Sequence, residues 1–553
     1  MSGFKHAFSL SKAEVRNSTP PGTTTLIGIY TPAINISSYS LLFAEHLEWT
    51  ASNQIHDEVR LVPQPTADPA DPLNFSRLRK MGILFSMCLV PFVVNFTSAS
   101  ISSALPVYAA TPIFGLPPRP FSELTHLIAV NILMLGASNL LWVPLSYIIG
   151  RRPVMLLSLL LLTLSSMWAG LTTSFDSLLA ARVFMGIGGG PADAVSPDVV
   201  GEIFFVHQRG RVLAFYTVFL ASGSFVGPMA GGYIASHNGL AWIHWTNVIL
   251  SAIAFVVCFF LQPETLYERP MSSVLASADT ADKSVTVTKE NIGATTTPTA
   301  TDPSSYAPYT FVRSLKLFTW HGGVGRKFLA PYLTLRLPGV WLVSLWYAGL
   351  VGAIVTISTV GAQIVSSPPY LWGANAGLIN AGALVGSVLG AIYTYFVADF
   401  TTKRLAKKDI HGYSEPESRI VTAIPALFIS TAGTIILGLV AQNPSPKGWV
   451  GLQVAFGMVA FGLMQAPSVG FNYIIESYPM IAGDCFVAIT CSRAVIAFAW
   501  TFFVGTWTHN AGYAQPFGIF GMLLGIFGLL SVPYSIWGKR FRIATAPWVE
   551  NLL

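Results

Sequence analysis

The chain has 553 residues, of which 52% are hydrophobic and only 10% are charged. A soluble domain carries about a quarter charged residues, so this composition excludes a disordered chain and argues against an ordinary soluble enzyme. The formal net charge of +6 does not indicate nucleic-acid binding, because the lysines and arginines lie between apolar segments, as in membrane proteins.

Residues 1–76 are predicted to form a cytosolic tail. They contain no short apolar segment followed by a cleavage site, so no signal peptide is expected. Residues 28–49 stand out within the tail because they are fairly apolar, yet they are too short and polar to cross a bilayer. A disordered segment, a membrane-bound segment and an error in the gene model all remain open for them.

The rest of the chain contains about twelve apolar stretches of roughly 20 residues, the length that crosses a bilayer as a helix. Backbone groups in lipid need internal partners, and continuous apolar runs favour helices over alternating β-strands. We therefore predict an all-α membrane protein with two six-helix bundles, residues 77–262 and 338–537. The spans are 81–106, 124–149, 153–172, 178–201, 212–236, 240–261, 338–362, 374–398, 419–441, 449–475, 484–506 and 516–537.

Residues 263–337 form the predicted cytosolic loop between the bundles. The middle of this loop is small, polar and rich in threonine, as expected of a flexible linker. Its end, residues 311–329, mixes aromatic and basic side chains, which fits either a helix on the membrane surface or a plain loop. Residues 538–553 are predicted to be a second cytosolic tail.

The orientation follows from the basic residues of the loops. Lysines and arginines cluster before the first span, after the last span and in most loops that follow an even-numbered span. The loops that follow an odd-numbered span contain only Arg119 and Lys447. The connection between the tenth and eleventh spans is an exception, with no basic residue. This bias places both termini and the central loop on the cytosolic side of a multi-pass protein, which we expect in the plasma membrane.

Charged residues inside predicted spans are candidates for function, because they are costly in lipid and should face the bundle interior. Arg182 and Arg493 are the only basic ones. Arg182 is expected to be either functional or a snorkelling anchor, and Arg493 to pair with an acid or to gate. Asp193 lies roughly three turns after Arg182 and is our candidate for proton binding, since a desolvated carboxylate gains a raised pKa. A structural hydrogen-bonding role is its alternative.

Gly223, Gly227 and Gly231 recur every four residues, which leaves one helix face bare for a close neighbour. Pro228 lies among them and should kink the span. Tight packing alone would explain this pattern, and a gating role would use the same close contact.

Polar and aromatic side chains within the spans are the candidates for substrate contact, although each could equally join two helices. They are Asn95, Asn131, Asn139, Trp142, Asn247, Gln363, Gln465, Asn472 and Tyr473. Cys88, Cys258, Cys485 and Cys491 lie in apolar runs and are interpreted as packing residues.

The two halves each end their second span in basic residues, Gly150-Arg151-Arg152 in the first and 403–408 in the second, as in the repeats of transporters. From about residue 63 to 542 the chain resembles the major facilitator superfamily, in particular its fungal drug/proton antiporter-like branch. The resemblance is carried by LVPQPTADPADPLNF, GASNLLWVPLSYIIGRRPV, ARVFMGIGGGPADAVSPDVVGEIFFVHQRGR, GSFVGPMAGG, LQPETLYER, EPESRI and YIIESYP, in this order.

The resemblance implies several roles. Arg182 would match an arginine implicated in proton transfer, and the glycine motif would help to close the outer gate. Arg151 and Arg152 would form the basic half of an inner gate, and Glu476 would keep the charge of an aspartate usual in the second half. Apart from the resemblance, Glu202 closes the fourth span and is expected to be a gate residue that pairs with a loop arginine. Family members usually have an acid where this chain has Tyr147, whereas Asp399 keeps an acid in the second half. We therefore expect Tyr147 to replace an ion pair by a hydrogen bond.

No nucleophile–base pair, metal-ligand spacing or phosphate-binding loop is visible, so we expect neither an enzyme nor a cofactor or metal. The expected partners are a small-molecule substrate and the lipid bilayer, without nucleic acid, and the protein is expected to be a monomer. The leading hypothesis is a proton-coupled exporter of small amphipathic molecules. Uptake of a polyamine or nutrient, and a membrane sensor that no longer transports, are the alternatives.

Overall fold

The computed structural model describes residues 2–11, 14–15, 18, 20, 24–25, 68–110, 119–267, 320, 322–408, 413–478 and 481–552. Residues 28–49, about which the sequence left three possibilities, lie outside them, as do 311–319 of the central loop. The described residues are almost entirely helical, as predicted.

The first bundle is built from apolar helices that cross it in alternating directions. They are α4 (Arg77–Ala99) with η2 (Ser102–Ala104) and α5 (Leu105–Ala110); α6 (Phe121–Leu124), α7 (His126–Ala137) and α8 (Asn139–Ile149); α9 (Arg151–Leu171); α10 (Phe175–Gly189) and α11 (Pro191–Ile203); α12 (Val206–His237); and α13 (Leu240–Leu261). The bounds of the predicted spans agree with these helices to within a few residues.

The second bundle repeats this arrangement after a short connecting helix. Its elements are α16 (Val324–Thr334), α17 (Pro338–Ser366), η4 (Gly373–Asn380), α18 (Ala381–Lys408), α19 (Glu417–Gln442), α20 (Gly448–Leu463), the π-helical η5 (Ala466–Phe471), α21 (Asn472–Ser477), α22 (Ala482–Ala511), α23 (Ala514–Leu529) and α24 (Ser531–Leu552).

Eleven helical stretches of the described chain are long and apolar enough to cross a membrane. The twelfth crossing is the predicted span 178–201, which is divided into α10 and α11 at Gly190 and Pro191. The backbone of Gly190 keeps right-handed helical dihedrals, so α10 and α11 follow one another as a single crossing with a local irregularity at Pro191. The protein is therefore a multi-pass membrane protein with twelve crossings.

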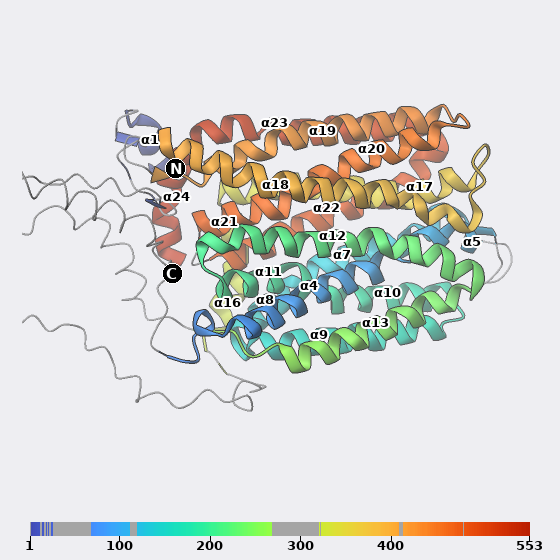
Figure 1. The fold of residues 1–553 in the computed structure, drawn as a ribbon, viewed down its shortest axis with the longest axis horizontal. Coiled ribbons are helices and arrows are strands. Elements are labelled where there is room, and N and C mark those ends of the chain that lie inside the picture. The colour runs from blue at the N-terminus through green and yellow to red at the C-terminus, as the bar shows by residue number, and fades with distance from the viewer. Residues whose placement is uncertain are drawn as a thin grey trace, which may run out of the picture.

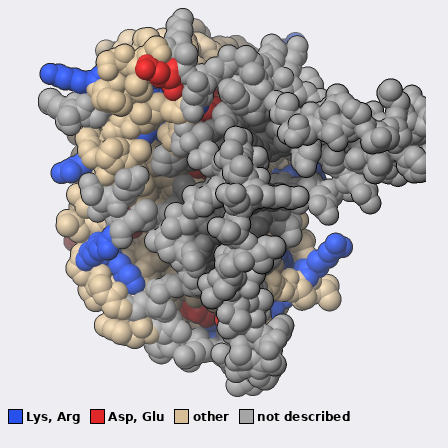
Figure 2. Space-filling model, turned by 90° about the vertical axis from the view of Figure 1, so that its left-hand side faces the viewer, with Lys and Arg blue, Asp and Glu red and all other residues tan. Residues whose placement is uncertain are grey.

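The helices lie side by side along the long axis of the molecule, and both chain ends are at the left-hand end in Figure 1. We call this end, which also carries Arg151 and Arg542, the basic end. Viewed directly, it shows Lys and Arg side chains around its edge (Figure 2).

The predicted tail 538–553 is instead the continuation of α24, which ends near the helix α1 (Ser2–Ser9) at the basic end (Figure 1). Phe541 of α24 packs edge-on against Phe4 and Phe8 of α1, and Arg540 donates a hydrogen bond of 3.0 Å to the carbonyl of Ala7. Nearby, β1 (Thr24–Thr25) pairs with β2 (Tyr413–Ser414) in antiparallel fashion. The N-terminal segment is thus attached to the second bundle.

The two bundles contact each other towards both ends. At the end opposite the basic end, Tyr233 of α12 donates a hydrogen bond of 2.6 Å to Asn375 of η4. The imidazole of His126 also stacks on Phe502 of α22 there, with ring centroids 4.3 Å apart. Towards the basic end, α11 and α8 meet α22. The two bundles thus touch each other near both ends of the molecule.

Candidate functional site

The two bundles are joined in their interior by an ion pair between Asp193 of α11 and Arg493 of α22. The exposed fraction is 0% for Asp193 and 4% for Arg493. Tyr347 of α17 completes the group: the guanidinium lies 4.9 Å from the centroid of its ring and 3.4 Å from its hydroxyl oxygen. The sequence suggested that Arg493 pairs with an acid, and in the structure this acid is our proton-binding candidate.

Polar atoms remain unsatisfied around this pair. The Oδ1 atom of Asp193 and the Nε atom of Arg493 are buried and have no hydrogen-bond partner. Buried polar groups are nearly always hydrogen-bonded, so an unsatisfied one requires an explanation. A hydrogen-bond donor placed at the free carboxylate oxygen would satisfy it.

Arg182 lies in a different environment from Asp193, although both belong to the same crossing. Its guanidinium is fully buried and donates to three backbone carbonyls, those of Leu127 at 3.1 Å, Thr97 at 3.1 Å and Ser98 at 2.6 Å. It therefore joins α10 to α4 and α7 instead of snorkelling to the membrane surface. It shares no hydrogen-bond partner with Asp193 among the described residues.

Most substrate-contact candidates form hydrogen bonds that hold helices together or close a helix on itself. Asn131 bridges Ser98 and the carbonyl of Arg182, and Trp142 donates to the carbonyl of Ile187. Similar bonds occupy Asn95, Asn139, Asn247, Gln465, Asn472 and Tyr473, the last with Tyr534. Gln363 is half-buried in α17. These hydrogen bonds fit the helix-joining alternative that the sequence left open, and substrate contact by any of these residues stays a prediction.

Arg151 is the centre of an ionic cluster at the basic end of the first bundle. Its guanidinium forms an ion pair of 2.7 Å with Asp198 and a bidentate ion pair with Glu202, and both acids belong to α11. The backbone N–H groups of Arg151 and Arg152 donate to the carboxylate of Glu264, at 3.0 and 3.2 Å. An acid at the N-terminus of α9 is favourable because of the helix dipole. The Arg152 side chain donates to the carbonyl of Phe259.

Tyr147 acts together with this cluster. Its hydroxyl donates a hydrogen bond of 3.0 Å to Asp198, and a Cβ added to Gly483 of α22 would lie only 1.8 Å from that hydroxyl. Lys327 of α16 donates to the backbone carbonyl of Tyr147 at 2.7 Å. We expected the hydrogen bond to replace an ion pair. Instead, Arg151 keeps its ion pairs through Asp198 and Glu202, and Tyr147 adds to them.

Asp198 belongs to this cluster and was not among the residues predicted from the sequence. Its Oδ2 would lie 3.1 Å from a Cβ on Gly483, so the acid faces the first turn of α22. Asp198 precedes Glu202 by one helical turn, which places both acids on one face of α11. That spacing was a signal present in the sequence.

The second bundle has its own ionic cluster at the basic end. Arg542 of α24 pairs with Glu417 of α19 at 2.7 Å and with Glu415, and Glu415 also pairs with Lys539 at 2.7 Å. Burial raises the pKa of Glu415, but Arg542 and Lys539 outweigh it and hold that pKa below its usual value.

A second pair in this bundle joins Arg419 of α19 to Glu476 of α21 in a two-pronged contact. The gate candidate Glu476 therefore has a basic partner. Asp399 lies on α18, and its side chain is outside the described part of the structure.

The glycines of α12 face α4 directly. A Cβ on Gly223, Gly227 or Gly231 would lie 2.2, 2.6 or 2.0 Å from the backbone oxygen of Phe92, Phe96 or Ser100, respectively. A real Cβ atom cannot lie this close to a carbonyl oxygen, so the two helices can approach each other only because these positions are glycine. The neighbouring Pro228 faces the other bundle, where a Cβ on Gly377 would lie 2.3 Å from its carbonyl oxygen.

Residues 87–480 match the family model of the Major Facilitator Superfamily. The chain belongs to the major facilitator superfamily. An uncharacterized transporter of this superfamily from Schizosaccharomyces pombe is 27% identical, over 88% of this chain and 89% of the relative. A multidrug transporter from Candida glabrata is 24% identical, over 86% of this chain and 78% of the relative.

Solved structures of this superfamily share the fold. The proton:xylose symporter XylE superimposes with a TM-score of 0.57 at 14% identity, covering 83% of this chain and 97% of that one. The human organic anion transporter MFSD10 gives a TM-score of 0.53 at 17% identity, with 82% and 99% coverage. The predicted major facilitator fold is thus confirmed, and the sequence relatives are fungal transporters, as the motifs implied.

Proposed function

We propose that this major facilitator is a proton-coupled transporter of the plasma membrane that exports small amphipathic molecules by alternating access. The observation that carries the proposal is the Asp193–Arg493 pair, because each bundle contributes one buried charge to a single contact. The names of two sequence relatives support export as the direction of transport. One is a multidrug transporter from Candida glabrata, and the other is an efflux pump from Floropilus chiversii.

The coupling follows from the cost of separating buried charges. Removing one partner of a buried ion pair leaves an uncompensated charge, at a cost of about 3–5 kcal/mol. The bundles therefore resist parting while Asp193 is ionised. A proton on Asp193 neutralises the carboxylate, weakens its attraction to Arg493 and lowers this resistance. Loss of the proton restores the pair, so the two states of the transporter differ in proton occupancy.

The ionic clusters at the basic end would then form the second gate. Asp198 and Glu202 hold Arg151 in the first bundle, while Tyr147 and Asp198 lie against α22 of the second bundle. The positive-inside bias assigns this end to the cytosol. Substrate would enter here from the cytosol when these contacts open.

A flux assay tests the proposal. Purified protein is reconstituted into proteoliposomes, and uptake of a fluorescent amphipathic dye is followed with and without an imposed pH gradient. The wild type should accumulate dye only with the gradient. Asp193→Asn should lose the response to the gradient but keep exchange of dye across the membrane. Glu123→Gln is the matched control, because its exposed pair with Arg119 is at the membrane surface.

Two results would count against it. Gradient-driven accumulation that survives Asp193→Asn would remove Asp193 from coupling. Dye transport that ignores the gradient in the wild type would show that the protein is not proton-coupled at all. Applying the gradient in the opposite direction distinguishes export from uptake, which remains the alternative.

A further inference from the structure

A small pocket lies where α12 of the first bundle meets α18, α19 and η5 of the second bundle, near the basic end. It is lined by Gly210, Arg211, Ala214, Thr394, Tyr395, Arg419, Ser468, Val469 and Asn472. Its enclosed part has a volume of about 20 Å³. A space of this size holds a single water-sized group and excludes a drug-like substrate.

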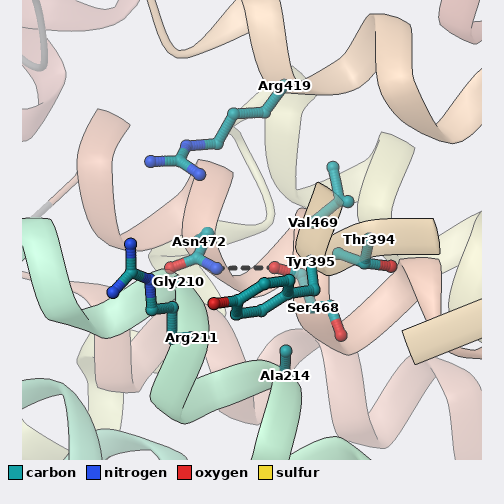
Figure 3. A pocket seen from close by; sticks show the side chains of 9 residues that line it. All are labelled: Gly210, Arg211, Ala214, Thr394, Tyr395, Arg419, Ser468, Val469 and Asn472. Atoms are coloured by element: carbon teal, nitrogen blue, oxygen red, sulfur yellow. Dashed lines mark hydrogen bonds between the residues drawn. The ribbon is translucent and has the colours of Figure 1, made fainter. Parts of the chain in front are cut away.

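Two guanidinium groups face this pocket from different bundles. Figure 3 shows Arg211 on α12 and Arg419 on α19, with the amide of Asn472 between them. The Arg211 guanidinium lies 5.8 Å from the centroid of the Tyr395 ring, and the Nη1 atom of Arg419 would be 4.0 Å from a Cβ on Gly210. Glu476 pairs with Arg419, so these three charged groups carry one net positive charge.

A buried polar atom in the same pocket is unsatisfied. The hydroxyl of Ser468 has no hydrogen-bond partner, although the residue is only 2% exposed. The unsatisfied hydroxyl indicates room for a polar group, and the net positive charge favours an anion. The planar guanidinium of arginine can donate two parallel hydrogen bonds to two oxygens of one phosphate.

The surroundings indicate that the anion belongs to a lipid. One face of α18 presents a continuous row of exposed apolar side chains that ends at the pocket, namely Val385, Val388, Leu389, Ile392, Tyr395 and Phe396. Across the seam, Phe215 of α12 is also exposed, one turn from Arg211. Acyl chains would lie along this row while the phosphate reaches the arginines, as expected of basic pockets between transmembrane helices.

We propose that the pocket is a binding site for the phosphate headgroup of an anionic phospholipid. The headgroup would contact Arg211 in one bundle and Arg419 in the other. Because one lipid would then connect both bundles, it stabilises the state in which this seam is closed. The proposal is independent of proton coupling and of the transported substrate.

Native mass spectrometry of the full-length protein tests the proposal. The protein is equilibrated in detergent with mixtures of phosphatidylserine and phosphatidylcholine, and the retained lipids are counted. We expect a preference for phosphatidylserine that falls roughly fivefold in Arg211→Gln, the effect of one basic residue near an anionic lipid. Arg336→Gln is the matched control, since Arg336 is exposed just before α17 and does not line the pocket.

Two further variants and one competitor complete the test. Ile392→Asn interrupts the apolar row without touching the arginines, and it should weaken lipid retention as well. Inorganic phosphate should compete poorly, because it gains nothing from the apolar row. Equal retention of both lipids by the wild type, or an unchanged preference in Arg211→Gln, would overturn the proposal. Displacement by inorganic phosphate at comparable concentration, with Ile392→Asn behaving as wild type, would instead show a site for a soluble anion.

Discussion

The hydroxyl of Tyr147 donates a hydrogen bond of 3.0 Å to Asp198, and both groups lie against Gly483 in the first turn of α22. This relationship connects the two bundles at the basic end. Tyr147 belongs to α8 and Asp198 to α11, both in the first bundle. Gly483 lies near the beginning of α22 in the second bundle. A side chain on Gly483 would collide with the Tyr147 hydroxyl, so the absence of a side chain there allows the contact.

Loss of the Tyr147 hydroxyl should weaken closure at this end. Tyr147→Phe removes a hydrogen bond to a charged group, worth about 1.5–3 kcal/mol, while Arg151 keeps its pair with Asp198. We expect faster hydrogen–deuterium exchange in the first turns of α22, with little change at the opposite end. Tyr332→Phe is the control, because Tyr332 is exposed on α16. Unchanged exchange in Tyr147→Phe would mean that the hydroxyl does not contribute to closure.

Replacing Tyr147 by an acid should open this end further. Tyr147→Asp would add a carboxylate beside Asp198 and Glu202, which already share Arg151, and like charges at close range repel each other. The same exchange measurement should show more opening than in Tyr147→Phe. Greater protection in Tyr147→Asp would contradict the assignment of Asp198 as the acid of this gate.

The ion pair between the bundles predicts non-additive stabilities. Asp193→Leu and Arg493→Met each leave one buried charge without its partner, at a cost of about 3–5 kcal/mol. The double variant leaves neither charge, so its unfolding midpoint in detergent should lie above that of both single variants. If the shift of the midpoint in the double variant equalled the sum of the shifts in the two single variants, the two residues would not interact in the folded protein.

The glycine face of α12 predicts a strong packing effect. Gly231→Val would place side-chain atoms against the backbone of Ser100, where even a Cβ lies 2.0 Å from the carbonyl oxygen. We expect loss of monodisperse protein in size-exclusion chromatography. Gly518→Val is the control, since nothing lies within 4 Å of a Cβ there. Normal yield of Gly231→Val would mean that α4 and α12 can separate at little cost.

The sequence predicts the spans well because lipid forces each apolar run into a helix of fixed length. It is less informative where hydropathy changes without a change in structure. Helix α24 continues after residue 537 as the chain becomes polar, because Glu415 and Glu417 bind its arginine and α1 packs on its aromatic side chains.

The site is only partly predictable for a different reason. A charge inside a span is visible in the sequence, and this identified Asp193 and Arg493 separately. Their contact, across 300 positions of the chain, depends on how two bundles pack and leaves no local pattern. Asp198 is hard to predict for a related reason: the family usually has its acid at the position of Tyr147 in α8, whereas the acid that faces α22 here comes from α11.

The acidic cluster of the second bundle predicts a pH dependence for the end of α24. The pKa of Glu415 is held below its usual value by Arg542 and Lys539. A group with a lowered pKa in the folded state stabilises the fold above its unfolded pKa of about 4.5 and ceases to do so as the pH falls through the folded value. Once each exchange rate is divided by the intrinsic rate at the same pH, residues 539–552 should therefore be well protected at neutral pH and lose protection under acid conditions. Glu415→Gln should exchange faster than the wild type at neutral pH, and the difference should disappear in acid.

Glu123→Gln, at the opposite end, should leave this segment unchanged at every pH. A difference that persisted in acid would show that the contact does not depend on the charge of Glu415.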